Sequence, residues 1–490
     1  MVFRSALIFC CAILVWTPLA VAEALRVSVP AIPETLDPHR AVTSAEQFLA
    51  RKLFTGLVTA DADGAIEPGL AERWTVSPDG LNYRFELRRG LTWSDGKRID
   101  ADTITNSLAR ALDPATAAPF YNLLLPIKNA EPYRLGTLAP NAKLGVAAPD
   151  RNTVVITLDR PSHQFLGVLA LPVAAPVPLH RIAALKNAWA AKENVIGDGP
   201  MVLSHSMNGF VLKPNAANPG PARDEMLLTA DQAAADITVG AMPLAGADGP
   251  AALYQLAVNV TRAPLDQREI RHALSMVIDR EALVAALRLP GLTPAYSFVA
   301  APEAVQAPYA RLSASDRHII AEALLLDLPP LRRRTIKVVM PDLQADKPVH
   351  EAVAAALQKA WAPLGFQAEP AVLALRDYEE AILNGDFDVA WPPNWAGVQG
   401  PADSMASTLF AFSQAAGPWN AGRYREPAFD QFMLAADADL SPEFRLSQWR
   451  SAEALLIEDQ PAWPLFFYST IPSTVHVPGL SGSDAATIRR

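Results

Sequence analysis

The residues best suited to catalysis in this chain do not form a complete catalytic motif. His350-Glu351 begins the zinc-binding H-E-x-x-H pattern, but Ala354 stands where the second histidine is required. Ser94-Asp95-Gly96-Lys97 has the S-x-x-K spacing of penicillin-recognising enzymes, but the glycine inside it indicates a turn and not the start of a helix. The chain contains no G-x-S-x-G and no Walker loop. The sequence therefore predicts a protein that is not an enzyme, and a hydrolase is kept as the catalytic alternative.

Residues that bind metals are also sparse. The eight histidines are mostly isolated in sequence, and the two cysteines, Cys10 and Cys11, both lie in the first 22 residues. Zinc sites in proteins usually combine closely spaced Cys and His ligands. We therefore expect no metal site and no cofactor, and histidines brought together by folding are the alternative that stays open.

Side chains that could bind a ligand without reacting are more plentiful. Trp391, Trp395 and Trp419 offer flat apolar faces to a sugar ring or a peptide side chain, although tryptophans at such positions can equally fill a core. Arg423 could pair with a ligand carboxylate, and a solvated surface arginine is the competing interpretation.

Length and charge limit the class of protein further. A chain of 490 residues exceeds what one hydrophobic core usually organises, so at least two packed units are expected. The net charge is −9, and the longest basic run is Arg332–Arg334, so no nucleic-acid partner is expected.

The N-terminus has the pattern of a cleavable signal peptide. An apolar run from Ala6 to Trp16 leads to Ala20-Val21-Ala22, a small-x-small cleavage pattern. We expect residues 1–22 to be removed after Ala22, with Ala24 as the second choice. Phe9 precedes the cysteine pair where a lipid-anchored protein needs a small residue, so no lipid anchor is expected.

The elements that would position these residues are strands and helices in alternation. Trp74–Val76 and Leu81–Leu87 flank a Ser-Pro-Asp-Gly turn and predict a hairpin, and Asp100 is placed to cap a helix over 101–111. Asp266 is similarly placed to cap a later helix. Further on, the pattern predicts strands at 336–340, 366–372 and 387–390 and helices at 349–361 and 377–383. This alternation predicts an α/β fold in more than one lobe.

Ordered short motifs identify a family. The chain resembles the family-5 extracellular solute-binding proteins, the dipeptide-, oligopeptide- and nickel-binding receptors of ABC importers. The resemblance rests on Leu36–His39, Leu53–Leu57, Pro68–Trp74, Leu87–Gly90, Trp93–Lys97, Gly197–Pro200, Val258-Asn259, Arg271–Leu274, Ile278–Arg280 and Tyr424–Asp430. These motifs occur in the family's order over most of the chain after the leader.

The resemblance implies two lobes that close on a ligand like a hinged trap. It places lobe one at 23–257 with an extra subdomain at about 56–165, lobe two at 258–466, and a return to lobe one at 467–490. The segment between Pro214 and Leu253 is shorter and richer in Ala and Gly than the family pattern, so its strands are weakly defined.

The resemblance also implies a site. Short main-chain segments would pair with an extended ligand, and aromatic residues would wall the cleft. The positions implied by the resemblance are Val42, Thr43 and Ser44; Asn394 to Val398, which includes Gly397; Phe120 and Tyr121; and Phe467 and Tyr468. The side-chain chemistry adds Trp391, Trp395, Arg423 and Asp403 to the candidate site.

One family feature is missing from this site. The peptide receptors hold the ligand's ammonium on an aspartate shortly after the strand at 387–390, but this chain has Gly397 or Val398 there. No acidic residue lies between Asp388 and Asp403. A buried ammonium without a counter-charge costs on the order of several kcal/mol. We therefore expect an N-blocked or cyclic peptide, an oligosaccharide or opine-like compound, or a peptide whose amine meets another carboxylate. Asp403 is our candidate for that carboxylate.

These observations predict a monomeric periplasmic receptor that captures a peptide-like ligand and delivers it to an inner-membrane ABC permease. The alternative is the same fold with a non-peptide ligand, such as an oligosaccharide, an opine or a metal chelate, and the missing aspartate favours it. The catalytic alternative would be a periplasmic hydrolase.

Overall fold

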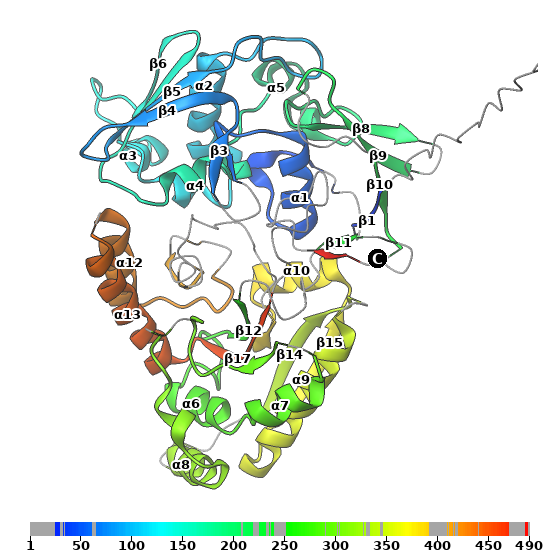
Figure 1. The fold of residues 1–490 in the computed structure, drawn as a ribbon, viewed down its shortest axis with the longest axis vertical. Helices are drawn as coiled ribbons and strands as arrows, with labels where there is room; N and C mark the ends of the chain where they lie inside the picture. Colours follow the sequence, from blue (N-terminus) through cyan, green and yellow to red (C-terminus); the bar gives the residue numbers. More distant parts are fainter. Residues whose placement is uncertain are drawn as a thin grey trace, which may run out of the picture.

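The computed structural model shows two bodies of mixed helices and strands, one above the other in Figure 1. Among the residues that the structure describes, none of the helices combines the length and the apolar character that a membrane span requires. The described residues are 25–29, 33, 35–60, 65–206, 209–218, 225–231, 235, 237–239, 251–289, 291–300, 302, 304–326, 328–329, 334–343, 346–391, 409, 411–414, 416, 420–439, 441–469 and 486–488.

The upper body, lobe one, is built on a six-stranded sheet with the order β18-β11-β1-β10-β9-β8. Its strands are β1 (Leu25–Ser28), β8 (Met201–Ser206), β9 (Gly209–Pro214), β10 (Met226–Thr229), β11 (Ile237–Val239) and β18 (Ala486–Ile488). β1 is parallel to β10 and β11, whereas β18 is antiparallel to β11. The chain therefore returns to this sheet near its C-terminus.

The remainder of lobe one lies between β1 and β8 in sequence. A four-stranded sheet has the order β4-β5-β7-β6, and β2 pairs with β3. The strands are β2 (Val58–Ala60), β3 (Ile66–Pro68), β4 (Ala71–Val76), β5 (Asn82–Leu87), β6 (Val146–Asp150) and β7 (Thr153–Thr157). The helices are α1 (Ser44–Leu53), α2 (Ala101–Leu112), α3 (Ala130–Arg134), α4 (Phe165–Leu169) and α5 (Leu179–Leu185). Short 3₁₀ helices are η1 (Pro38–Arg40), η2 (Pro114–Thr116), η3 (Tyr121–Leu124), η4 (Pro172–Ala174) and η5 (Lys186–Ala190).

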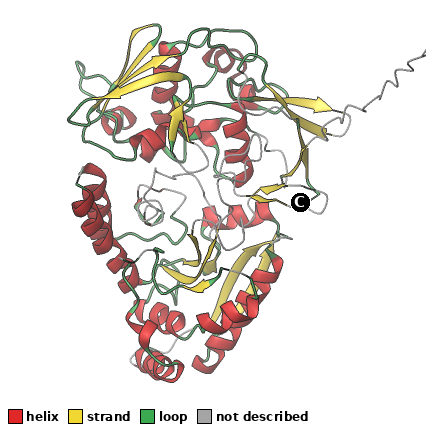
Figure 2. Cartoon of the chain, viewed as in Figure 1, coloured by secondary structure: helices red, strands yellow, loops and turns green. Residues whose placement is uncertain are grey.

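Lobe two, the lower body, has a second six-stranded sheet with the order β13-β17-β12-β16-β14-β15. Its strands are β12 (Ala251–Val258), β13 (Thr293–Pro294), β14 (Thr335–Pro341), β15 (Gln367–Leu373), β16 (Val389–Ala390) and β17 (Ala462–Ser469). Figure 2 shows helices around this sheet. They are α6 (Arg268–Met276), α7 (Arg280–Leu287), α8 (Ala314–Leu326), α9 (Lys347–Trp361), α10 (Leu375–Asn384), α12 (Pro427–Ala438) and α13 (Pro442–Asp459), with η6 (Pro308–Arg311) and η7 (Ala362–Leu364).

Each lobe has its own hydrophobic core. The lobe-one core runs from Val27 to Leu228 and also takes in Ala416, whereas the lobe-two core runs from Tyr254 to Tyr468. The predicted two-lobed α/β fold is therefore confirmed. The lobe-two core begins before residue 258 and continues past 466, because β12 and β17 pair along their length inside its sheet. The residue-level division of the chain into lobes stays a prediction.

Local sequence explains the start of several helices, including α1, α2 and α7. Asp100 accepts a hydrogen bond from the Thr103 N–H at 3.0 Å, and the Thr103 hydroxyl faces the Asp100 N–H, which completes a capping box for α2. The prediction that Asp266 caps the later helix was wrong, because the N-cap residue of α6 is Gln267. The reason is a preceding hydrogen-bonded turn, in which the Asp266 N–H donates to the Arg262 carbonyl at 3.0 Å and delays the helix.

The Gly197–Pro200 motif packs against the end of α1. A Cβ atom at Gly197 would lie 1.8 Å from the Leu53 carbonyl oxygen, so no side chain fits at this position. The Gly199 N–H donates to the same carbonyl at 2.8 Å and satisfies an acceptor at the helix end. The motif therefore fixes the C-terminal end of α1 within lobe one.

Candidate functional site

Thr43 and Ser44 lie at the N-terminus of α1 in lobe one. The Thr43 hydroxyl accepts a hydrogen bond from the Glu46 N–H at 3.2 Å. Glu46 Oε2 in turn accepts the N–H groups of Val42 and Thr43 at 2.8 and 2.9 Å. Glu46 therefore already uses two of the three amide groups of the predicted segment Val42–Ser44. A ligand strand could bind these groups only by displacing Glu46.

Phe120 and Tyr121 lie elsewhere in lobe one. Phe120 is 2% exposed and packs in the lobe-one core. Tyr121 begins η3 and is half-buried, and the Arg134 guanidinium lies 3.4 Å from the centre of its ring. The face of Tyr121 toward Arg134 is thus occupied by a cation–π contact. Whether either ring meets a ligand stays a prediction.

Trp391 meets Tyr254 and Phe466 in lobe two, and the predicted Phe467 and Tyr468 follow Phe466 on β17. The Trp391 ring stacks on Tyr254 at 5.9 Å, and Tyr254 stacks on Phe466 at 4.6 Å. Phe467 is half-buried on β17 and pairs in register with Leu253, and Tyr468 follows it at 2% exposure. Tyr254 of β12, Phe466 of β17 and Trp391 just after β16 therefore form an aromatic stack. The burial of Trp391 favours its packing role, the second of the two predicted roles.

Three polar side chains in this region were not anticipated from the sequence. Tyr254 Oη, Tyr378 Oη and His350 Nε2 are buried without a hydrogen-bond partner in the part of the chain that the structure describes. Burial lowers the pKa of His350 to about 4, although its hydrogen bond with the Pro341 carbonyl acts in the opposite direction. Burial raises the pKa of Tyr254, and the nearby Asp346 adds to this shift. The His350 ring and both phenols are therefore uncharged at neutral pH.

The sequence pattern could have revealed only one of these three buried residues. The inward positions of β12 alternate Tyr254, Leu256 and Val258, so a buried tyrosine could have been inferred from the strand pattern. Nothing local in sequence brings Tyr378 of α10 or His350 of α9 near it.

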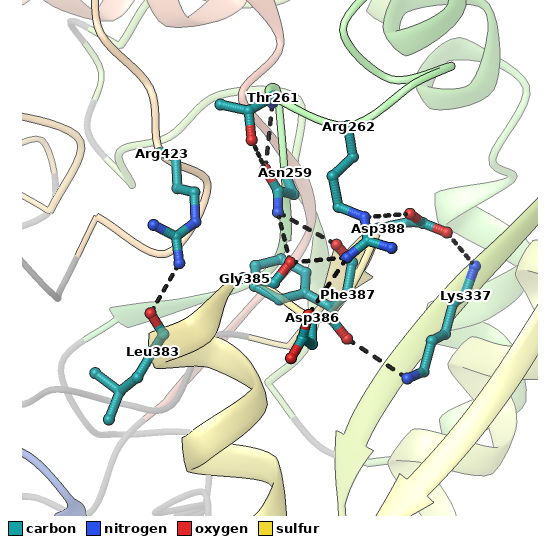
Figure 3. Close-up of polar contacts among 10 residues, drawn as sticks. All are labelled: Asn259, Thr261, Arg262, Lys337, Leu383, Gly385, Asp386, Phe387, Asp388 and Arg423. Atoms are coloured by element: carbon teal, nitrogen blue, oxygen red, sulfur yellow. Dashed lines mark hydrogen bonds and ion pairs between the residues drawn. The ribbon is translucent and has the colours of Figure 1, made fainter.

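Arg423 has a structural partner in lobe two. Its guanidinium Nη2 donates to the Leu383 carbonyl at 2.8 Å, as Figure 3 shows. The guanidinium also lies over Gly385, where a Cβ atom would come within 2.5 Å of Arg423 Nε and where φ is +75°. Arg423 thus satisfies a free carbonyl at the C-terminus of α10. The pairing of Arg423 with a ligand carboxylate stays a prediction. A ligand carboxylate would have to compete with the Leu383 carbonyl for the guanidinium.

Asn259 and Asp388 organise the same corner of lobe two (Figure 3). The Asn259 side chain donates to the carbonyls of Gly385 and Phe387 at 3.1 and 3.3 Å. Asp388 is fully buried, accepts the Lys337 N–H at 2.8 Å and lies 3.3 Å from Arg262 Nε. These contacts join β12, β14 and β16.

Six of the predicted positions lie outside the described residues. They are Asn394, Trp395, Gly397, Val398, Asp403 and Trp419. Their proposed roles rest on the sequence and stay predictions.

The described residues contain no cluster of three or more His, Cys, Asp or Glu side chains placed to hold a metal ion. What they offer is aromatic faces, neutral hydrogen-bonding groups and main chain on two separate lobes. This arrangement suits the binding of a ligand.

Two lobes, each on its own sheet and core, define a hinged two-lobed binding protein. The chain matches the family model described as "Bacterial extracellular solute-binding proteins, family 5 Middle" over residues 65–218 and 216–417. The chain belongs to this family.

Curated relatives are similar along nearly their whole length. The chain is 27% identical to the probable deoxycholate-binding periplasmic protein YgiS of Escherichia coli K12, covering 93% of this chain and 90% of that protein. It is also 27% identical to the periplasmic murein peptide-binding protein MppA of the same organism, covering 95% and 94%.

Solved structures show the same fold. Haemophilus influenzae OppA in complex with the peptide RPPGFSPFR superposes with a TM-score of 0.79 at 24% identity, covering 95% of this chain and 98% of OppA. Escherichia coli MppA superposes with a TM-score of 0.77 at 25% identity, covering 95% and 98%. The unliganded open form of MppA gives 0.57, with 95% and 97% covered.

Proposed function

We propose that this protein is a periplasmic receptor that binds a peptide-like ligand between its two lobes and delivers it to an inner-membrane ABC permease. The observation that carries the proposal is the family membership, together with a fold that superposes over both lobes on a receptor solved with a bound peptide. MppA and OppA are named as periplasmic peptide-binding proteins, which supports a peptide ligand and a periplasmic location for this chain.

The lobe-two corner supports binding and gives no support to catalysis. Its imidazole and phenols, those of His350, Tyr254 and Tyr378, are uncharged and buried. Its buried carboxylate, Asp388, is engaged by the Lys337 N–H and Arg262, so these described groups do not pair a nucleophile with an activating base. A receptor returns its ligand unchanged, so incubation with labelled peptides followed by mass spectrometry should recover them intact. Cleaved peptide would support the hydrolase hypothesis instead.

The ligand class can be tested directly. Native mass spectrometry of protein purified from its own periplasm should show a co-purified mass that fragments as a peptide or a modified peptide. Calorimetry with defined peptides would then give the affinity. A co-purified bile acid, sugar or metal chelate, with no heat from any peptide, would refute the peptide proposal and support the non-peptide alternative.

A further inference from the structure

The C-terminal end of α12, in lobe two, bonds directly to lobe one. The Asp437 carbonyl accepts the His163 N–H at 3.0 Å, and Asp437 Oδ1 accepts the Gln164 N–H at 3.0 Å. The two donors come just before α4, whose Phe165 is buried in the lobe-one core. On the other side, Phe429 of α12 is buried in the lobe-two core. The two hydrogen bonds therefore join elements that belong to different cores.

A second contact reinforces the first. Asn122 Nδ2, in lobe one, donates to the Gln414 carbonyl at 3.2 Å. Gln414 is held on α12, because its N–H and its Nε2 donate to the two carboxylate oxygens of Asp430 at 2.9 and 2.8 Å. Ala416, two residues further on, is fully buried in the lobe-one core. The α12 side of lobe two thus meets lobe one at more than one point.

These contacts and the lobe-one strands that border the two passages between the lobes lie on opposite sides of the molecule in Figure 1. In Figure 1 α12 stands at the left edge, whereas β11 and β18, the lobe-one strands next to the passages, lie on the right. When two lobes separate about a hinge, the points farthest from it move most. The contacts of Asp437 and Gln414 can therefore form only when the lobes are together.

The arrangement of the lobes agrees with this. The structure superposes better on the first MppA structure, at a TM-score of 0.77, than on the unliganded open form of the same protein, at 0.57. The two lobes of this chain thus stand in a relation different from that in the open form.

We propose that Asp437 is a latch that stabilises the closed arrangement through protein–protein hydrogen bonds, whatever the ligand. The donors are main-chain N–H groups of lobe one, so the bonds require no ligand group. The carboxylate makes the Gln164 bond a charge-assisted one, which is stronger than a neutral hydrogen bond. The electrostatic influence of Asp437 also reaches Tyr83 of lobe one, where it adds to the burial that raises the pKa of that phenol. The inference rests on the hinged-receptor function proposed above, but not on the identity of the ligand.

The test measures the fraction of ligand-free protein in which the two lobes are closed. Cysteines at Asn122 and Gln414 (N122C/Q414C) form a reporter pair across the latch, in a chain that also carries Cys10→Ser and Cys11→Ser. The protein is unfolded and refolded to remove bound ligand, and the rate of disulfide formation is followed under mild oxidation. When opening and closing are fast, this rate is proportional to the closed fraction.

Asp437→Ala in this reporter chain should lower the closed-to-open ratio about tenfold, the ratio that corresponds to the loss of one hydrogen bond to a charged group. Cross-linking should slow by up to the same factor, and by the full factor where the ligand-free protein is mostly open. Glu443→Ala is the matched control, since Glu443 is an exposed acid in the first turn of α13, next to the same helix junction. It should leave the rate unchanged.

Equal rates for the reporter chain with and without the Asp437→Ala substitution would overturn the latch. If the reporter chain does not cross-link, the X-ray scattering measurement below decides instead, because a disulfide also requires suitable backbone geometry. Thermal melting of each variant checks that the lobes are folded. If the cysteine chain itself does not fold, X-ray scattering replaces the reporter: Asp437→Ala alone should raise the radius of gyration of the ligand-free protein, and no increase would overturn the latch. No ligand is added in either assay, so these results are independent of the peptide-binding tests.

Discussion

The buried His39 makes a strong prediction about stability and pH. The side chain is 1% exposed, with one ring nitrogen 2.8 Å from the Ala175 carbonyl and the other 2.9 Å from Arg110 Nη1. Because the arginine can only donate, Nδ1 must accept and Nε2 must carry the proton. The ring is therefore held neutral, and burial lowers the pKa of His39 to about 4 despite the attraction of the nearby Asp37.

The sign and the size of the effect follow from this shift. An unfolded histidine titrates at 6.5, so between pH 6.5 and about 4 the unfolded chain binds more protons than the folded one. The contribution of His39 to stability is complete above pH 6.5 and is lost progressively as the pH falls toward 4. Going from pH 7.5 to pH 5, the free energy of unfolding should fall by about 2 kcal/mol from this residue alone.

Urea unfolding at the two pH values, for the wild type and for His39→Gln, measures this contribution. Glutamine cannot be protonated, so the variant should be less stable at pH 7.5 but should lose about 2 kcal/mol less than the wild type on going to pH 5. His205→Gln, at an exposed position on β8, is the control and should keep the wild-type pH dependence. If His39→Gln loses as much stability as the wild type, His39 is not held neutral and the assignment of its hydrogen bonds is wrong.

Three further predictions concern the ligand, the lobe-two corner and the leader. Arg423→Ala should lower the free energy of unfolding by about 1 kcal/mol through the lost hydrogen bond at the end of α10 and leave ligand affinity unchanged; a large loss of affinity at unchanged stability would assign Arg423 to the ligand. Val398→Asp, or Gly397→Asp for the other register, should strengthen free-amine peptides roughly ten- to a hundredfold over acetylated ones, and calorimetry showing equal effects on both would reject the missing-anchor hypothesis. Intact mass of the exported protein should show a Cys-free chain starting at Glu23 or Leu25, and a retained leader or a lipid adduct would contradict it.

The elements were predictable because their signals are local. The strand predicted at 336–340 is β14 (Thr335–Pro341), and the helix predicted at 349–361 is α9 (Lys347–Trp361). Asp100 caps α2 as expected, since an N-cap bond joins residues three apart and needs nothing from the rest of the fold. Asp266 failed as a cap because the turn before α6 is stabilised by a main-chain bond that side-chain types do not reveal.

The partners of the candidate site residues were not predictable in the same way. Arg423 binds a carbonyl forty residues earlier in the chain, and Asp437 binds main chain of the other lobe. An arginine or aspartate beside a recognised motif has the right chemistry for a ligand, but the same chemistry satisfies helix ends and joins lobes. Only the fold decides which acceptor or donor is within reach.

The described part of lobe two limits which carboxylate could replace the missing ammonium anchor. Asp388 is the acid nearest in sequence before the family's anchor position, but it is fully buried and holds the Lys337 N–H and Arg262. Moving it to a ligand would break these bonds between strands and leave Arg262 without this carboxylate, which would cost more than one new ion pair returns. The neighbouring Trp391, Tyr254 and His350 are uncharged. A free ligand ammonium therefore needs a carboxylate other than Asp388, for which Asp403 is our candidate, or the ligand carries no free amine. Asp403→Asn separates these cases: it should weaken free-amine peptides selectively in the first case and change nothing in the others.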